Sequence, residues 1–211
     1  MTEEQKPPAK KKREEALPER LLRRALESVG DVVDRKFGRT IEPKSGLTTS
    51  QLIERMKKLG MYAAVHPWAV INGAIMHEGF GDGAYDMPPL ATIQTSGIVW
   101  GLGTDATAAN QYLPFTTLYF AVTGKMPGGI KVIRQTISRE DALIAHTRKN
   151  AFFVFQENNL GSIQPGKLAD LVALDRDYLT IPGDQIKDIR PVLTMVGGRI
   201  VYDGGTLNST R

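Results

Sequence analysis

The sequence predicts an α/β protein in which two successive helix-then-strand units precede a small antiparallel β unit. A helical segment stops at a glycine shortly before each of two apolar runs, 61–65 and 98–103. Further along, two β-prone runs, 192–196 and 199–202, are joined by two glycines only. Helix and strand in alternation are typical of a parallel sheet, whereas a two-glycine connection is typical of a hairpin.

The first 45 residues differ in character from the rest of the chain. Residues 1–17 are polar and highly charged, and we expect them to form a disordered tail. From 18 to 45 we expect a helical segment of undetermined origin, because Leu22, Leu26 and Val29 recur at helical spacing. Such a helix needs a partner surface for its apolar stripe.

Composition excludes several classes of function. There are no cysteines, which excludes disulfides, thiolate zinc sites and cysteine nucleophiles. The net charge of +4 comes largely from the N-terminal tail, where acidic residues are interleaved and aromatic residues are absent, so we expect no nucleic-acid binding. No apolar run is long enough to span a bilayer and no secretory signal is visible, so we expect a cytoplasmic protein without membrane contact.

The first α/β unit is marked by helix signals at both ends. Thr48 and Gln51 have the spacing of a capping box, and Gly60 is placed to end the helix. The apolar run 61–65 follows at once and ends in His66-Pro67-Trp68. A histidine at the end of a strand lies where substrates bind in α/β proteins, although a histidine that only hydrogen-bonds near the strand end is the alternative.

The second unit contains the residue of greatest interest, Asp105. Residues 72–86 are rich in glycine and show no period, so we expect a long loop of the kind that builds active sites. Pro88-Pro89 begins a short helix that Ser96-Gly97 ends, and the run 98–103 then leads to Asp105. A carboxylate at the C-terminal end of a strand suits catalysis or metal binding, and a structural turn is the alternative.

Beyond Asp105 we expect two helices and then the β unit. One helix runs from Pro114 to about Thr123, and another starts at Ser138 and extends to about Phe155. Turn-forming residues follow, then a strand over 168–174 and the glycine-linked hairpin. The α/β part therefore covers 46–157, and the C-terminal β unit covers 158–211.

Several motifs, in a fixed order, resemble the amidohydrolase superfamily, and their wording is nearest its amidohydrolase 3 branch. The longest is Gly161-Ser-Ile-Gln-Pro-Gly-Lys-Leu-Ala-Asp-Leu-Val172, followed by Asp175-Arg176-Asp177 and then the hairpin 196–202. Upstream, 138–143 resembles the last barrel helix of the family, and 101–105 resembles its eighth barrel strand. The resemblance extends over roughly 46–204.

The resemblance implies a fold and a function. The fold implied is the C-terminal part of a (β/α)8 TIM-type barrel, with the β unit belonging to a composite β-sandwich domain. The reaction implied is hydrolysis of carbon–nitrogen bonds, in small molecules such as amides and formamides, by a metal-activated water. Asp105 corresponds to the family's metal ligand and general base, and the metal implied is divalent, with zinc first. His66 and Trp68 take positions on the wall of the substrate pocket.

The chain also departs from the family pattern. It has three histidines, His66, His77 and His146, and no His-x-His pair. A catalytic zinc site needs about three protein ligands, so we expect metal binding by this chain to be weak or absent. Activity of the chain by itself is therefore not expected. The alternative is a non-catalytic fragment or subunit that needs a partner chain, or a second copy of itself, to complete the barrel.

Overall fold

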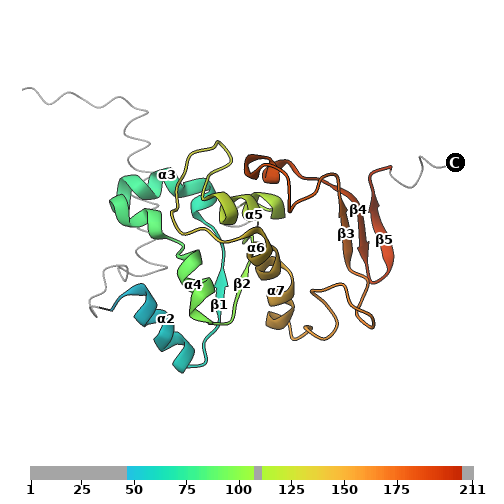
Figure 1. The fold of residues 1–211 in the computed structure, drawn as a ribbon, viewed down its shortest axis with the longest axis horizontal. Helices are drawn as coiled ribbons and strands as arrows, with labels where there is room; N and C mark the ends of the chain where they lie inside the picture. Colours follow the sequence, from blue (N-terminus) through green and yellow to red (C-terminus); the bar gives the residue numbers. More distant parts are fainter. Residues whose placement is uncertain (1–46, 107–110, 206–211) are drawn as a thin grey trace, which may run out of the picture. The chain divides into compact units, whose positions relative to one another are not determined.

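The computed structural model describes residues 47–106 and 111–205, and Figure 1 traces the chain through them. The expected tail 1–17 and helical segment 18–45 lie outside the described residues. In chain order the described elements are α2 (Thr49–Lys58), β1 (Ala63–Val65), α3 (Ala69–Phe80), the 3₁₀ helix η1 (Gly81–Asp86), α4 (Leu90–Ser96), β2 (Trp100–Leu102), α5 (Pro114–Thr123), α6 (Arg139–His146), α7 (Arg148–Phe153), β3 (Leu171–Leu174), the 3₁₀ helix η2 (Gly183–Asp188), β4 (Pro191–Val196) and β5 (Arg199–Asp203).

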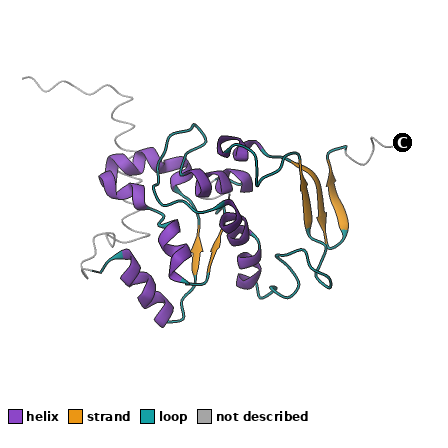
Figure 2. Cartoon of the chain, viewed as in Figure 1, coloured by secondary structure: helices purple, strands orange, loops and turns teal. Residues whose placement is uncertain are grey.

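Two small sheets among helices make this a mixed α/β fold, as Figure 2 shows by colour. β1 and β2 pair in parallel, with Ala63 opposite Trp100 and Val65 opposite Leu102, which confirms the predicted direction. β3, β4 and β5 form an antiparallel sheet in that order, which confirms the predicted β unit. Within the described ranges no helix is both long enough and apolar enough to cross a membrane.

Helix ends follow the local sequence signals closely. Thr48 Oγ1 accepts a hydrogen bond from Gln51 N, and Gln51 Oε1 accepts one from Thr48 N at 2.8 Å, so α2 begins at the predicted capping box. Gly60 follows the helix with a φ of 68°, in the left-handed region that glycine enters without strain. α5 begins at Pro114 and ends before Gly124, as predicted.

The β4–β5 hairpin is held by the segment just before β3. Gly197 and Gly198 form the turn with φ angles of 56° and 80°, which explains why both are glycine. Asp170 Oδ1 accepts a hydrogen bond from Gly197 N at 2.6 Å, and Ala169 O accepts one from Gly198 N at 3.1 Å. The Ala-Asp pair near the end of the longest family motif therefore has a structural role in this turn.

The prediction of a long loop over 72–86 is wrong, because α3 and η1 occupy those residues. α3 is apolar on most sides, so no helical period is visible in its sequence. Val70 is fully buried, and Gly73 lies against Val132, where an added Cβ would be 2.6 Å from Val132 Cβ. Residue 73 is therefore glycine because α3 packs closely against Val132 at this position. In the sequence alone, this glycine indicates a loop.

The single helix expected from Ser138 to about Phe155 is also wrong in its second half. Ser138 Oγ caps the start by accepting a hydrogen bond from Asp141 N at 3.0 Å, as predicted. The helix breaks at Thr147, whose hydroxyl donates to Leu143 O at 2.7 Å, and α7 then ends at Phe153. A threonine hydroxyl that bonds back to the preceding turn competes with regular helix geometry.

A reciprocal contact ties the segment after β3 to α6. The Arg139 guanidinium donates to Tyr178 O at 2.6 Å and to Ile181 O, and Tyr178 Oη donates to Arg139 O at 3.0 Å. Burial raises the pKa of the Tyr178 hydroxyl, so it remains a protonated donor at neutral pH. In the neighbouring η2, Ile186 is fully buried. Together these contacts join the polypeptide between β3 and β4 to the helices.

The packing role of Gly73 leads to a stability prediction with a matched control on the same helix. Gly73→Ala should lower the free energy of unfolding by about 1–3 kcal/mol, because the new methyl group overlaps Val132. Gly79→Ala meets nothing within 4 Å and should raise that free energy by about 0.5–1 kcal/mol, the ordinary helix preference for alanine. Urea unfolding of both variants measures the difference. Equal effects in the two variants would contradict the packing role of Gly73.

Candidate active site

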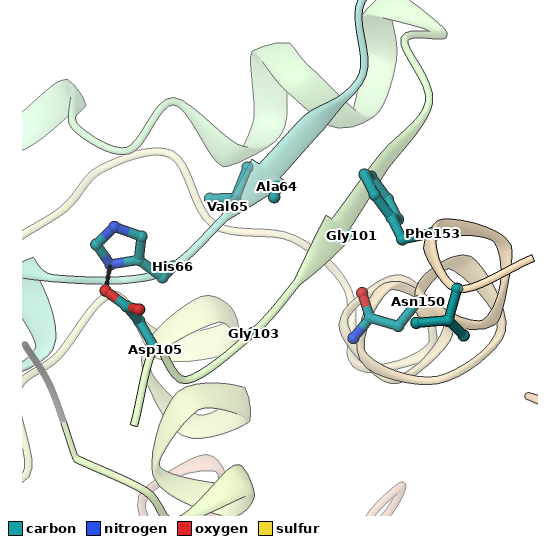
Figure 3. A pocket seen from close by; sticks show the side chains of 9 residues that line it. Ala64, Val65, His66, Gly101, Gly103, Asp105, Asn150 and Phe153 are labelled. Atoms are coloured by element: carbon teal, nitrogen blue, oxygen red, sulfur yellow. Dashed lines mark ion pairs between the residues drawn. The ribbon is translucent and has the colours of Figure 1, made fainter. Parts of the chain in front are cut away.

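His66 and Asp105 come together at the C-terminal edge of the parallel pair. His66 directly follows β1, and Asp105 lies three residues beyond β2. Parallel strands present their C-terminal ends at one edge, so the two residues emerge on the same side. His66 Nδ1 and Asp105 Oδ2 are 3.6 Å apart, and Figure 3 shows the two side chains pointing toward each other. The sequence placed both residues at this edge.

The backbone at Asp105 is unusual. Its φ of 53° lies in the left-handed region, which few residues other than glycine occupy. The turn before it is held by Thr104 Oγ1, which accepts a hydrogen bond from Ala106 N at 3.2 Å. Backbone strain of this kind occurs more often at functional sites than elsewhere. Here it directs the Asp105 carboxylate back toward the end of β1.

The imidazole of His66 has one nitrogen without a hydrogen-bond partner. Nδ1 is buried and makes no hydrogen bond with any described residue. The 3.6 Å to Asp105 Oδ2 is too long for a hydrogen bond, although it lies within the range of an ion pair. A buried polar atom without a partner is costly, so this geometry suits a pair that accommodates a further group.

The pair lies at one end of a cavity of about 350 Å³. The cavity wall includes the ends of both strands and one side of α7. Its lining residues are Ala64, Val65, His66, Gly101, Gly103, Asp105, Asn150, Phe153 and Val154. Apolar and glycine residues make up most of this wall, and the few polar side chains stand at definite places, as is usual for small-molecule sites.

The strand that carries Asp105 is firmly anchored on its other face. Trp100 is fully buried, and its indole Nε1 donates to Gln94 Oε1 at 3.0 Å. Lys149 Nζ donates to the same oxygen at 2.9 Å and lies 4.7 Å from the centre of the Trp100 ring. Burial lowers the pKa of Lys149. Asp105 therefore extends from a strand whose backing is rigid.

Asn150 on α7 contacts β2 beside the cavity and was missed by the sequence reasoning. Its side-chain Nδ2 donates to Leu102 O at 2.8 Å and to His146 O at 3.1 Å. The contact depends on Gly101, since a Cβ there would overlap Asn150 Oδ1 and lie 3.1 Å from Phe153 Cε2. A single asparagine within a helix carries no local signal, so only the packing of α7 on β2 identifies it.

Trp68, expected on the pocket wall, is placed elsewhere. It precedes the first residue of α3, and its backbone N donates to His66 O at 3.0 Å. It is not among the residues that line the cavity. The structure therefore brings His66 and Asp105 together, and it places Trp68 on the segment that leaves the strand end for α3.

The donors needed for a complete metal centre are not assembled within the described residues. No group of three or more His, Cys, Asp or Glu side chains converges in residues 47–106 and 111–205. The Asp105 carboxylate and the partnerless Nδ1 of His66 make two donors. Since catalytic zinc takes about three protein ligands, this donor set does not fit a whole zinc site.

The other two histidines have structural surroundings. The His77 ring stacks on Tyr85 at a centroid distance of 3.6 Å, and its Nε2 is 2.9 Å from Val132 O. His146 ends α6 with its Nε2 buried and without a hydrogen bond to any described residue. Desolvation by burial lowers the pKa of His146. His146 is thus a packing residue.

Comparison with known families gives one match that covers most of the chain. The model described as the Amidohydrolase family matches residues 19–202. This range includes both strands of the parallel pair, Asp105 and most of the C-terminal β unit.

Two curated relatives share about half of the chain. Both are named 5-methylthioadenosine/S-adenosylhomocysteine deaminase. The one from Symbiobacterium thermophilum is 26% identical over 130 residues, 54% of this chain and 28% of its own length. The one from Teredinibacter turnerae is 32% identical over 114 residues, 53% of this chain and 25% of its own length. The matched part of the chain thus spans little more than a quarter of each relative.

Solved structures share the fold at low sequence identity. The crystal structure of an amidohydrolase superposes with a TM-score of 0.52 and 18% identity, over 74% of this chain and 38% of that one. The zinc complex of the atrazine chlorohydrolase TrzN from Arthrobacter aurescens TC1 gives a TM-score of 0.50 and 20% identity, over 74% of this chain and 34% of that one. At these identities the likeness concerns the fold alone.

The buried position of His146 predicts how stability depends on pH. Its pKa is lowered in the folded protein from the ordinary value of 6.5, so the unfolded chain takes up a proton first as the pH falls. Stability from this residue is therefore present above about pH 6.5 and declines below it. His146→Gln should make the acid-side loss of unfolding free energy smaller. Urea unfolding at a series of pH values measures this, and an unchanged pH profile in the variant would contradict it.

Proposed function

The chain belongs to the amidohydrolase family, and from this premise we propose that it supplies the Asp105 end of an active site that hydrolyses carbon–nitrogen bonds. The observation that carries the proposal is the approach of His66 Nδ1 to Asp105 Oδ2, 3.6 Å apart at the mouth of two parallel strands and inside a cavity. The two curated relatives are named as deaminases, which also act on carbon–nitrogen bonds, and this supports the reaction class. The substrate proposed is a small molecule of amide type.

In this proposal Asp105 is the general base. Its carboxylate accepts a proton from the attacking water, and its side chain is 46% exposed, so water has access. His66 Nδ1 faces Asp105 Oδ2 across 3.6 Å. As the water loses its proton to Asp105, the hydroxide adds to the carbonyl-type carbon of the substrate and the C=O π electrons move to the oxygen. Return of that electron pair reforms the C=O bond and breaks the C–N bond, and the proton held by Asp105 passes to the departing nitrogen.

A divalent metal, with zinc first, is part of the proposal through the family. Asp105 would be one ligand, and His66 is the nearest second donor. The remaining donors must come from polypeptide beyond the described residues, because those residues do not complete the site.

The fold proposed for the whole site is the last part of a (β/α)8 barrel. In this view residues 46–157 contain the last β/α units and 158–211 the C-terminal β unit of a composite sandwich. Ala63 N donates to Val99 O, and Val65 O accepts from Gly103 N, so Ala64 between them directs its backbone groups away from β2. Among the described residues no strand pairs with this edge of β1, and an edge without a partner favours pairing with another strand.

A second candidate follows from that edge. The chain would then be a non-catalytic fragment or subunit that needs a partner chain, or a second copy, to complete the barrel. The incomplete donor set favours this reading for the chain on its own. Under the first candidate Asp105 is the general base of the completed site, whereas under the second the chain contributes no catalytic group.

The first test concerns metal and activity. The purified chain should bind less than one equivalent of zinc. It should show no Asp105-dependent hydrolysis of simple amides or formamides, so Asp105→Asn should leave the rate of hydrolysis unchanged. Zinc content by mass spectrometry and ammonia release measure the two quantities. Glu78→Gln, an exposed carboxylate on α3, is the control for loss of one charge. Stoichiometric zinc, with turnover lost in Asp105→Asn and kept in Glu78→Gln, would show that the chain is active alone.

The second test concerns the edge of β1 that faces away from β2 and has no strand partner in the described part of the chain. In dilute solution the amide proton of Ala64 should exchange faster than that of Ala63, which is bonded to Val99 O at 2.9 Å. If strands are added at this edge, the Ala64 amide becomes protected as the protein concentration rises, while Ala63 changes little. Hydrogen exchange followed by NMR measures both. Equal protection of the two amides in dilute solution would mean that the edge is already covered.

A further inference from the structure

The cavity has two chemically different ends. His66 and Asp105 stand at one end, where the ionisable groups are. Asn150, Phe153 and Val154 line the other end, beyond the glycines of β2, and Figure 3 shows Asn150 and Phe153 on the opposite side from the ion pair. A molecule that reacts at the first end therefore extends toward an amide group and apolar side chains.

The orientation of the Asn150 amide is determined by its neighbours. Its nitrogen lies 2.8 Å from Leu102 O and 3.1 Å from His146 O. Both are carbonyl oxygens, which only accept hydrogen bonds, so the group facing them must be the NH₂. Both donor hydrogens are thereby used, and the Oδ1 atom accepts no hydrogen bond from any described residue. Asn150 Oδ1 is therefore a hydrogen-bond acceptor whose direction is fixed by the two bonds that the NH₂ group donates.

This acceptor lies beside the same cavity as the ionisable end. Asn150 Oδ1 occupies the place where a side chain of residue 101 would begin, because a Cβ on Gly101 would overlap it. Gly101 is opposite Ala64 in the parallel ladder, and both residues line the cavity. His66 and Asn150 line it as well, so Asn150 Oδ1 and His66 address one space.

We propose that Asn150 Oδ1 is a specificity determinant that accepts a hydrogen bond from an N–H or O–H group of the substrate. Phe153 and Val154 then contact the apolar part that carries this donor. The inference rests on the proposed function, which places the reacting bond at Asp105. The substrate class is therefore an amide whose far end is an apolar or aromatic group with a hydrogen-bond donor.

Two amides that differ only in the donor test the inference. 4-Hydroxyphenylacetamide carries a phenolic O–H, and 4-methoxyphenylacetamide has the same ring and amide without it. Dissociation constants come from NMR shifts of the Gly101 amide and the Asn150 side-chain NH₂. The hydroxyl compound should bind the full chain roughly 3- to 10-fold more tightly, the usual range for one net hydrogen bond.

Two glycine variants provide a matched comparison. Gly101→Ala displaces Asn150 Oδ1 and should abolish the preference, so that both compounds bind equally. Gly79→Ala adds the same methyl group on α3, away from the cavity lining, meets nothing within 4 Å and should keep the preference. Thermal melting shows whether each variant is folded. If Gly101→Ala does not fold, the two-compound comparison in the unaltered chain, with a cross-relaxation contact between probe ring and Asn150 NH₂, still decides.

The outcomes separate this inference from the proposed function. Equal binding of both compounds, with shifts at His66 and Asp105, overturns the role of Asn150 and leaves the proposed function standing. A preference for the hydroxyl compound that disappears in Gly101→Ala, without any shift at His66 or Asp105, supports Asn150 as a donor-binding site and contradicts the proposed function. A preference that survives in Gly101→Ala, or no binding of either compound, overturns the inference.

Discussion

The absence of a side chain at Gly101 is the constraint on which the candidate site depends. It lets α7 lie against β2 closely enough for Asn150 to donate to Leu102 O. A methyl group there would force α7 away, and the wall made by Phe153 would move with it. The cavity therefore exists because one residue of a buried strand contributes backbone only, a use of glycine for close approach of another element.

A two-stranded sheet is marginal by itself, so the site relies on what lies behind and beside it. Trp100 and Leu102 are fully buried on the side of β2 opposite Gly101, and together they anchor the strand whose end leads to Asp105. The reciprocal bonds between Arg139 and Tyr178 then hold the segment after β3 against α6. His66 and Asp105 thus stand at the ends of strands with a buried, hydrogen-bonded base, an arrangement that suits a binding site.

The incomplete donor set and the length comparison are consistent with each other. The matched part of the chain spans about a quarter of the length of its curated relatives, and within the described residues it contributes Asp105 and His66 as converging donors. A site built from the ends of many strands loses donors in proportion to the strands that lie elsewhere. Membership of the amidohydrolase family is shown by the family match, and in the proposed function turnover depends on polypeptide that supplies the other donors.

Local chemistry in the sequence determined the helix starts at Thr48, Pro114 and Ser138 and the hairpin at Gly197-Gly198, because caps, proline and glycine act on their immediate neighbours. It also placed His66 and Asp105 at strand ends, since parallel strands share an edge. Only the tertiary structure decided the rest. Gly73 became a helix-packing residue through Val132, and Asn150 became part of the cavity through Gly101. Contacts between residues far apart in the chain leave no local pattern, so no reading of either segment alone could reveal them.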